Sequence, residues 1–420
     1  MNLEFEKNLE KYAEVILKIG LNLQPGQRLL IGTPNVYQSG APIELAPLIR
    51  VITRKAYQIG ARFVEVIWDD EQLKQIRFQH APRDSFEEYS TWRTNCQYDF
   101  AKNSDAIVRI LAYNPDLLSG HDHSLIATTI KTHLKYSKPY SDLVSQNALN
   151  WVAITAPVEG WTEKVLSDIP HENRKYKFWD ILFGICRIKN EDPLAAWEAH
   201  IKQLGARCDY LNNKHYIALK FEGPGTDLKI GLPKGHIWGS ARFKNRNGID
   251  YVANIPTEEV FTLPHKNKTE GVVTATKPLP IDGMIENLSL TFSEGRVINA
   301  TATKGEDLLL KILDTDEGTR RLGEVALVPH SSPISQSGLL FYNILLDENA
   351  SCHIALGRAL KFWLKNGEKM TDEEFSAAGG NISMDHVDFM IGSNKIDVDG
   401  ILENGTVESI MRKGEWDFDI

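Results

Sequence analysis

The spacing of apolar residues predicts alternating helices and strands in the first half of the chain. Apolar positions recur at helical spacing from the start of the chain to about Asn22, which predicts an amphipathic helix. Beyond it, apolar runs at 28–32 and 62–68 predict two strands, and helical spacing over 45–60 predicts a helix between them. A strand, helix, strand order implies a parallel pair of strands joined by a right-handed crossover.

The same alternation continues more weakly to about residue 190. Apolar runs at 105–110 and 151–155 predict two further strands, which are separated by polar sequence compatible with helices. Residues 1–190 are therefore predicted to form an N-terminal open α/β domain. This part of the chain contains neither a Walker loop nor a GxGxxG motif, so the sequence gives no phosphate-cradling reason for such a fold.

The pattern changes after residue 190, which predicts a second domain over 191–420. Helical spacing over 192–211 is followed by short strand-like runs separated by Gly, Pro and Asn. The predicted strands are 215–221, 227–231, 271–276, 287–292 and 297–303. Helices are predicted at 306–313 and 354–363. The fold class is therefore α/β in two domains, the second a C-terminal mixed α/β domain, and a chain of 420 residues exceeds the usual size of a single core.

Composition and charge narrow the possible partners and location. A formal net charge of -9 argues against nonspecific binding to nucleic acid or to anionic lipid, because both need clustered Lys and Arg. The four cysteines are widely scattered without a CxxC pair, which fits a reducing compartment. Acidic residues among the first ten do not fit a signal peptide, and no run approaches the roughly 18 to 20 apolar residues of a membrane helix. We expect a cytoplasmic protein without a nucleic-acid or membrane partner.

Chemistry-bearing residues gather in four segments of the predicted second domain: 256–265, 323–335, 347–357 and 381–393. In the last segment, His386 and Asp388 are two residues apart, so in an extended chain they share a face. Their neighbours are apolar, which predicts a buried strand in which an unpaired carboxylate would be costly. A cation would satisfy it, but so would a hydrogen bond within the strand pair.

The other candidates also have a structural explanation when each is taken alone. Glu324 precedes a strongly apolar run and fits a solvated strand end as well as a cleft. Glu258 and Glu259 lie on opposite faces of a predicted strand, so in regular geometry only one of them faces a shared site. His353 lies in an apolar stretch and fits a hydrogen-bonded core histidine. Asn349 and a few neighbouring polar residues could orient ligands or make only local hydrogen bonds.

Taken together, these residues make a donor set that suits divalent ions. The set is Glu258, Glu324, His353, His386 and Asp388. Imidazole and carboxylate donors suit Zn, Co or Mn, and carboxylates can bridge two ions. Two ions about 3.5 to 4 Å apart would activate a water between them, polarise a scissile carbonyl and hold the free α-amine of a peptide. The spacing alone does not prove that the four segments meet.

The strings TEEVFT, GEVALVPHSSPIS, DENASCHIALG and HVDFMIGS resemble, in this order, those of the aminopeptidase S and aminopeptidase T family of thermophilic-type leucyl metalloaminopeptidases. LQPGQRLLI and AYQIGARFVEVIW extend the resemblance into the first half of the chain. It implies that the five residues of the donor set are the metal ligands, and that Glu259 is the candidate general base. A base beside a ligand would need a bulge or turn at Thr257. The resemblance also implies a homodimer that releases N-terminal amino acids from short peptides with a free N-terminus.

One position departs from the family pattern. A tyrosine usually stands seven residues after the histidine of the HIALG string, where its phenol could stabilise the tetrahedral intermediate, and here that position is Leu360. A leucine cannot donate a hydrogen bond, and loss of one such donor costs about 100- to 1000-fold in turnover. The chain would then be a slower enzyme, use another donor or take a different substrate.

Three alternatives to an aminopeptidase stay open at this point. The same donors would serve another metal-dependent peptide or amide hydrolase, such as a dipeptidase. Leu360 favours a catalytically weakened homologue that binds metal or peptide. The four strings would also fit a nonenzymatic α/β binding protein in which they serve only packing.

Overall fold

The computed structural model describes residues 3–281 and 283–420, and these fall into two compact units. The first runs to His200 and also contains Arg242–Pro256, and the second contains Ile201–Ala241 and Thr257–Ile420. The division at residue 200 lies inside helix α8 (Pro193–Lys214). Arg242–Pro256 lies beyond the predicted boundary at 190 but belongs to the first unit, because strand β11 (Asn254–Ile255) pairs in parallel with a strand of that unit.

The first unit is built around a five-stranded sheet whose neighbouring strands are all parallel, in the order β11-β6-β5-β1-β3. Its other strands are β1 (Arg28–Ile31), β3 (Phe63–Val66), β5 (Ala106–Ile110) and β6 (Trp151–Ile154). Two small pairs accompany it, β2 (Ala41–Pro42) with β4 (Trp68–Asp69) and β9 (Arg242–Lys244) with β10 (Asp250–Val252). The apolar runs in the sequence predicted all four long strands of this sheet.

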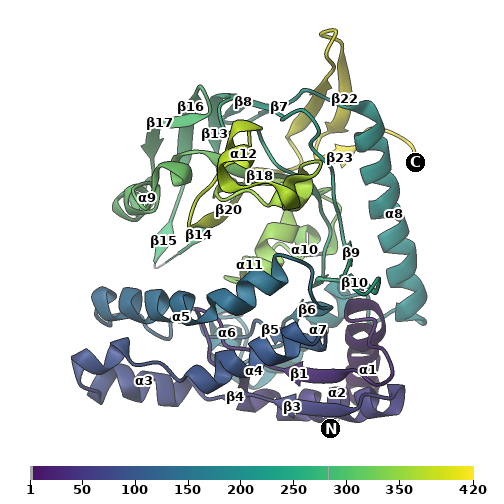
Figure 1. Cartoon of the computed structure of the whole chain (residues 1–420), viewed down its shortest axis with the longest axis vertical. Coiled ribbons are helices and arrows are strands. Elements are labelled where there is room, and N and C mark those ends of the chain that lie inside the picture. The colour runs from purple at the N-terminus through teal and green to yellow at the C-terminus, as the bar shows by residue number, and fades with distance from the viewer. Residues whose placement is uncertain (1–2, 282) are drawn as a thin grey trace. The chain divides into compact units, whose positions relative to one another are not determined.

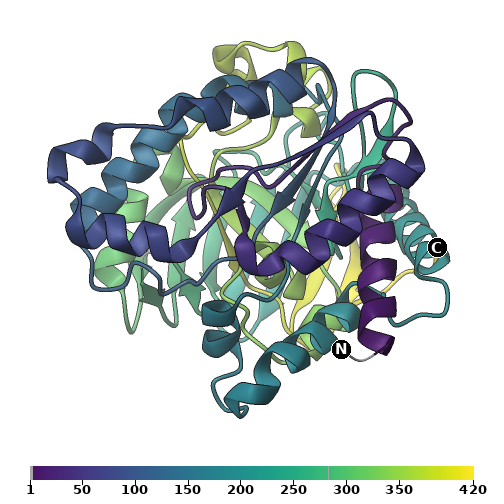
Figure 2. The same ribbon diagram turned by 90° about the horizontal axis from the view of Figure 1, so that it is seen from below.

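Helices join the strands of the first unit (Figures 1 and 2). They are α1 (Leu3–Val15) with the π-helical turn η1 (Ile16–Gly20), η2 (Ile43–Leu45), α2 (Ala46–Ile59), α3 (Glu71–His80), η3 (Arg83–Glu87), α4 (Thr91–Lys102), α5 (His123–Val144), α6 (Glu159–Val165), α7 (His171–Ile185) and α8. Helix α2 shows how the sequence sets them: its buried residues recur at helical spacing, and Gly60 ends it in the left-handed conformation at φ 108°. The first two residues of the helix predicted at the start of the chain lie outside the described residues.

The second unit contains two antiparallel sheets. The larger has eight strands in the order β17-β16-β13-β8-β7-β21-β22-β23, and the smaller has four in the order β12-β18-β19-β20. Strands of the larger sheet are β7 (Ala218–Gly223), β8 (Thr226–Gly231), β13 (Thr269–Thr274), β16 (Ser289–Ser293), β17 (Arg296–Thr301), β21 (Asp397–Ile401), β22 (Val407–Arg412) and β23 (Glu415–Trp416). The smaller sheet consists of β12 (Val260–Thr262), β18 (Leu322–Leu327), β19 (His353–Gly357) and β20 (His386–Met390).

Short elements complete the second unit. They are the pair β14 (Leu279–Pro280) and β15 (Met284–Ile285), α9 (Glu306–Leu313), η4 (Glu317–Arg320), α10 (Pro333–Gln336), α11 (Ile344–Asp347), η5 (Glu348–Ala350), η6 (Lys361–Trp363), η7 (Gly367–Lys369) and α12 (Asp372–Ala377). Helix α9 has the predicted bounds. In the described part of the chain, no helix has both the length and the apolar character needed to cross a membrane.

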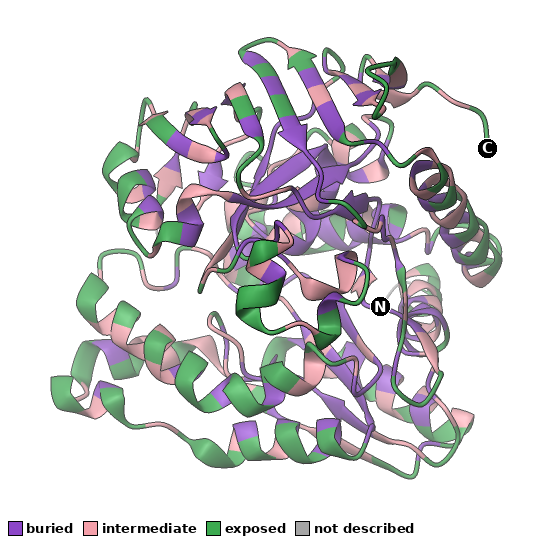
Figure 3. Ribbon diagram, turned by 45° about the horizontal axis from the view of Figure 1, so that its top comes forward, coloured by how far each residue is buried: buried purple, intermediate pink, exposed green. Residues whose placement is uncertain are grey.

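The helix predicted over 354–363 is wrong. Residues His353–Gly357 form strand β19, and every residue of it is buried. A short continuous apolar run fits a fully buried strand as well as a buried helix, because both of its faces are covered and no periodicity separates the two. The four-stranded sheet is almost entirely buried, whereas strands of the larger sheet carry purple, pink and green bands in Figure 3. As part of strand β19, His353 pairs with Ala326 on β18 and with Met390 on β20.

Candidate metal centre

The register of the four-stranded sheet places the candidate residues on one face. Glu324 on β18 lies opposite Ala355 on β19, which lies opposite Asp388 on β20. Residues that face each other across antiparallel strands point to the same side of the sheet. His353 and His386 are each two residues from this row, so their side chains share its face. The three strands thus bring two carboxylates and two imidazoles together around a small residue.

The same register decides between the two adjacent glutamates. Phe261 on β12 lies opposite Ala326, which lies opposite His353. Glu259 lies just before β12, and its carboxylate reaches the face of His353, whereas Glu258 belongs to neither donor group of the described residues. The distances agree, because Glu259 Oε2 lies 3.1 Å from His353 Nε2.

Two groups of three donors result, and Glu324 belongs to both. One group is Glu259, Glu324 and His353, and the other is Glu324, His386 and Asp388. In each group, one donor atom from every residue lies within 4.8 Å of the others. His353 Nε2 is 3.8 Å from one oxygen of Glu324, and His386 Nε2 is 3.6 Å from the other. His386 Nε2 is also 3.3 Å from Asp388 Oδ1.

Both histidines are fixed in the tautomer that suits metal binding. His353 Nδ1 lies 3.2 Å from the carbonyl of Ser351, and His386 Nδ1 lies 2.7 Å from the carbonyl of Arg358. A carbonyl can only accept, so each Nδ1 carries a proton and each Nε2 faces the carboxylates. Gly357, at φ 99°, turns the chain at the end of β19, where an added Cβ would lie 2.2 Å from the Asp385 carbonyl oxygen.

The buried carboxylates and imidazoles shift one another's pKa. Burial lowers the pKa of His386, but the charges of Asp388 and Glu324 outweigh burial and raise it to about 10. Burial favours a higher pKa for Asp388, but His386 overcomes it and lowers the pKa. For Glu324, burial dominates and raises the pKa although His353 opposes it. The imidazoles and carboxylates of the two groups are therefore coupled electrostatically.

Two orphaned oxygens show that the residues fit a metal ion. Glu259 Oε2 and Asp388 Oδ1 are buried, yet neither accepts a hydrogen bond within the described part of the chain. Each faces the Nε2 atom of a histidine whose Nδ1 bears a proton, so lone pairs meet unless a proton or a cation lies between them. Leaving such oxygens unpaired is costly, and a divalent cation satisfies both kinds of donor at once.

Glu258, which the family resemblance implied as a ligand, is not among the residues of the two donor groups in the described part of the chain. Glu258 is only 3% exposed, and its backbone N–H donates to Asn349 Oδ1 over 2.7 Å. Burial lowers the pKa of Arg207 on helix α8. The charges of Glu258 and Glu415 oppose this effect, because they favour the charged form of Arg207. Arg207 also lies over the ring of Trp416 at 5.1 Å.

Sequence reasoning missed Glu348, which lies within the DENASCHIALG string. Burial raises the pKa of Glu348 well above its usual range, and the charges of Glu259 and Asp388 raise it further. Glu348 is therefore a fourth acidic side chain, close enough to the three carboxylates of the donor groups to interact with them. The sequence pointed to Glu348 only through its position in that string, beside Asn349 and five residues before His353.

Leu360 lies just before η6 in extended conformation and is half-buried. Its carbonyl accepts the N–H of Trp363 over 3.3 Å. The chain between β19 and η6 also carries Arg358, whose carbonyl holds His386. Leu360, which departs from the family pattern, thus lies two residues after Arg358, whose carbonyl orients the candidate ligand His386.

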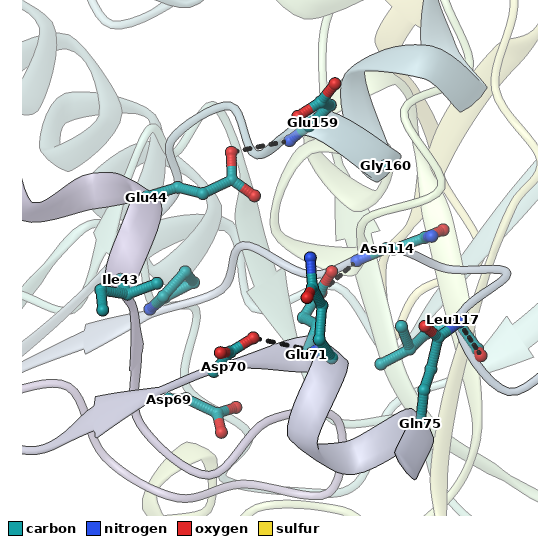
Figure 4. A pocket seen from close by; sticks show the side chains of 12 residues that line it. Ile43, Glu44, Asp69, Asp70, Glu71, Gln75, Asn114, Leu117, Glu159 and Gly160 are labelled. Carbon is teal, nitrogen blue, oxygen red and sulfur yellow. Dashed lines mark hydrogen bonds between the residues drawn. The ribbon is translucent and has the colours of Figure 1, made fainter. Parts of the chain in front are cut away.

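The first unit contains a cavity of about 290 Å³ whose wall is rich in acidic residues (Figure 4). Its carboxylates already have structural partners: Asp70 caps α3, Glu71 accepts the N–H of Asn114, and Glu44 accepts the N–H of Glu159. These carboxylates tie loops and helix ends, and imidazole does not line the cavity. The donor set of the second unit is therefore the candidate centre.

A buried set of imidazole and carboxylate donors, with Nε2 atoms aimed at shared carboxylates, is typical of hydrolytic metalloenzymes. The chain belongs to the family described as Thermophilic metalloprotease (M29), whose profile matches residues 5–416. It is accordingly an enzyme that hydrolyses peptide bonds. The resemblance that the four strings carried is confirmed.

Individual relatives match over nearly their whole length. The chain is 43% identical over 417 residues to "Aminopeptidase 2" of Geobacillus stearothermophilus, covering 99% of both chains. It is 38% identical over 413 residues to "Aminopeptidase T" of Thermus thermophilus, covering 98% of this chain and 99% of that one. The solved structure of wild-type AmpT from Thermus thermophilus matches with a TM-score of 0.92 at 38% identity, covering 99% of this chain and 100% of that one. The predicted mixed α/β fold is confirmed.

Proposed function

We propose that this protein is a metalloaminopeptidase that releases the N-terminal residue of short peptides. The observation that carries the proposal is the pair of three-donor groups that share Glu324. A shared carboxylate with one oxygen toward each histidine is the arrangement expected of a bridging ligand. The names of these relatives support the class of activity, since both are aminopeptidases.

In this proposal, two divalent ions are held by five residues. Glu259, Glu324 and His353 hold one ion, and Glu324, His386 and Asp388 hold the other. Glu259 replaces Glu258 in the set that the sequence suggested, because Glu259 has a carboxylate oxygen 3.1 Å from His353 Nε2 and belongs to a donor group. Zn, Co and Mn all suit these donors, and such ions would supply the Lewis acidity that peptide hydrolysis needs.

The residues of the chain would orient the donors and handle the proton. The carbonyls of Ser351 and Arg358 hold the two imidazoles with Nε2 toward the site. A Glu259 that holds an ion is not free to serve as the general base. Glu348 lies beside Asn349, whose Nδ2 is 3.4 Å from Glu348 Oε1, and its charge interacts with those of Glu259 and Asp388. Bound cations would favour its ionised form, and we assign the proton-accepting role to that carboxylate. Glu348→Gln should then lower turnover by about 100-fold or more with metal content unchanged, and retained turnover would remove this assignment.

A substrate panel tests the aminopeptidase activity itself. Purified protein loaded with Zn, Co or Mn is assayed on paired free and N-acetylated peptides of the same sequence. Free peptides should be cleaved one residue at a time from the N-terminus, and blocked peptides should resist. Equal cleavage of both members of a pair would show another metal-dependent amide hydrolase.

Two wider features belong to the same proposal. The homodimer that the family resemblance implies is tested by the mass of the protein in solution. A cytoplasmic location is supported by the four cysteines, which are all free thiols. A catalytically weakened homologue is the second candidate function, because Leu360 lacks the phenol expected at its position.

A further inference from the structure

Asn349 connects the segments that surround the proposed metal centre. Its side chain is fully buried, with 0% of its surface exposed. It lies in the short helical turn η5, next to Glu348 and four residues before His353. Every polar atom of its carboxamide has a partner in the structure. A fully bonded and buried amide of this kind fixes the backbone around it.

The carboxamide oxygen of Asn349 holds the segment that carries Glu259. Asn349 Oδ1 accepts the backbone N–H of Glu258 over 2.7 Å. Residues 257–259 precede β12 and are not part of the strand. The hydrogen bond from Asn349 therefore holds a piece of backbone that the sheet does not hold. The direction of the Glu259 side chain depends on the backbone of the residue before it.

The remaining bonds of Asn349 reach two further segments. Asn349 Nδ2 donates to the Leu345 carbonyl over 3.1 Å and lies 3.4 Å from Glu348 Oε1. The backbone carbonyl of Asn349 accepts the Ser332 hydroxyl over 3.1 Å, and Ser332 also caps helix α10. One buried residue thus joins 257–259, the loop after β18 and the turn that precedes β19.

We propose that Asn349 is a positioning residue for Glu259. Its carboxamide fixes the backbone at Glu258, so that the next side chain reaches His353 and Glu324. The inference rests on the proposed function, because it takes Glu259 as a metal ligand. Glu259 belongs to only one of the two donor groups, so Asn349 governs the affinity of one ion and leaves the ion at Glu324, His386 and Asp388 unaffected.

The test measures the two metal affinities separately in metal-free protein titrated with Co or Zn. Asn349→Ala should weaken one of the two ions by roughly 10- to 100-fold, as other residues that orient ligands do, and keep the affinity of the second. Asn349→Asp keeps an oxygen acceptor for the Glu258 amide and should restore most of the lost affinity. In the double variant with Glu259→Gln, Asn349→Ala should add little, because both changes act on the same ion.

Asn150 provides the matched control. It is also fully buried, with its Nδ2 donating to the Leu21 carbonyl over 2.8 Å and its Oδ1 accepting from Gln27 over 2.9 Å, but it lies in the first unit. Asn150→Ala should lower stability without changing either affinity.

Two results would overturn the inference: unchanged affinities in Asn349→Ala, or equal weakening of both ions. If Asn349→Ala does not fold, the inference is decided by Asn349→Asp and Asn349→Ser. The serine side chain is too short to reach the Glu258 amide, so serine must weaken one ion selectively while aspartate does not. A wild-type protein that binds no ion would instead refute the proposed function, which separates the two failures.

Discussion

Glu324 and Asp388 lie on either side of Ala355 in one row across three strands. The methyl group of Ala355 is the only side chain between the two carboxylates in that row, so it leaves the space above the sheet to the donors. Larger residues at this position would fill that space. The arrangement therefore gives a first test that changes no polar atom of the site.

Ala355→Val should lower the metal content of the protein while the sheet still forms. Two added methyl groups overpack a buried position, which costs about 1–3 kcal/mol of stability, and they also occupy the space between Glu324 and Asp388. The control is Val325→Leu, which overpacks the opposite face of the same sheet. Metal analysis and thermal unfolding of both variants should show similar stability loss but metal loss only in Ala355→Val. Equal metal content in the two variants would contradict the geometry.

The adjacent glutamates give a second test. Glu259→Gln should remove one ion, because Glu259 faces His353. Glu258→Gln should retain both ions, because Glu258 belongs to neither donor group and its charge acts on Arg207. Titration of each metal-free variant with Co measures the number of ions bound. The reverse result, with Glu258→Gln losing an ion, would restore Glu258 as the ligand.

Leu360 gives a third test that concerns turnover alone. Leu360→Tyr should raise turnover by about 100-fold if the absent phenol limits the reaction, with metal content unchanged. Leu360→Phe supplies the ring without the hydroxyl and should leave turnover near that of the wild type. If tyrosine and phenylalanine behave alike, the hydroxyl is not what the position lacks.

Metal binding should release protons at neutral pH. The pKa of His386 is raised from 6.5 to about 10 in the metal-free protein by Asp388 and Glu324, which outweigh the effect of burial. At pH 7.5 this imidazole holds a proton that a metal ion must displace, so metal affinity falls as the pH is lowered. Calorimetric titration in two buffers of different ionisation enthalpy should show at least one proton released per chain. No proton release would contradict a role for His386.

The same pKa shift fixes how the stability of the metal-free protein depends on pH. Because folding raises the pKa of His386, the charged imidazole contributes stability fully below about pH 6.5, and this contribution is lost as the pH rises toward 10. His386→Asn should remove this dependence from the unfolding free energy. A wild-type curve that is flat between pH 6.5 and 10 would show that His386 carries no stabilising proton.

Local sequence patterns predicted much of the fold but not the composition of the site. The apolar run at 28–32 became β1, and helical spacing over 306–313 became α9, because each pattern depends on residues close in sequence. Strand parity also predicted that only one of Glu258 and Glu259 faces the site. Which of them does so depends on pairing with β18, more than 60 residues away, and no local pattern contains that register.

The stretch around His353 shows the same limit. Its apolar residues fit both a helix and a buried strand, and only the neighbours β18 and β20 decide for a strand. Asn349 was visible in the sequence as a polar residue in one of the family-like strings, but its bond to Glu258 joins positions 91 residues apart. The sequence did not single out Glu348 for the same reason. Its carboxylate becomes a candidate only because the fold brings it near Glu259 and Asp388.

The number of divalent ions bound per chain tests the central claim most directly. Protein grown with Zn, Co or Mn and dialysed at pH 7.5 is analysed for metal alongside Glu259→Gln, Asp388→Asn and Glu324→Gln. The structure predicts two ions in the wild type, one in each of the first two variants, and fewer than one in Glu324→Gln, because only Glu324 belongs to both donor groups. Fewer than one ion in the wild type, or two ions in Glu324→Gln, would contradict the account.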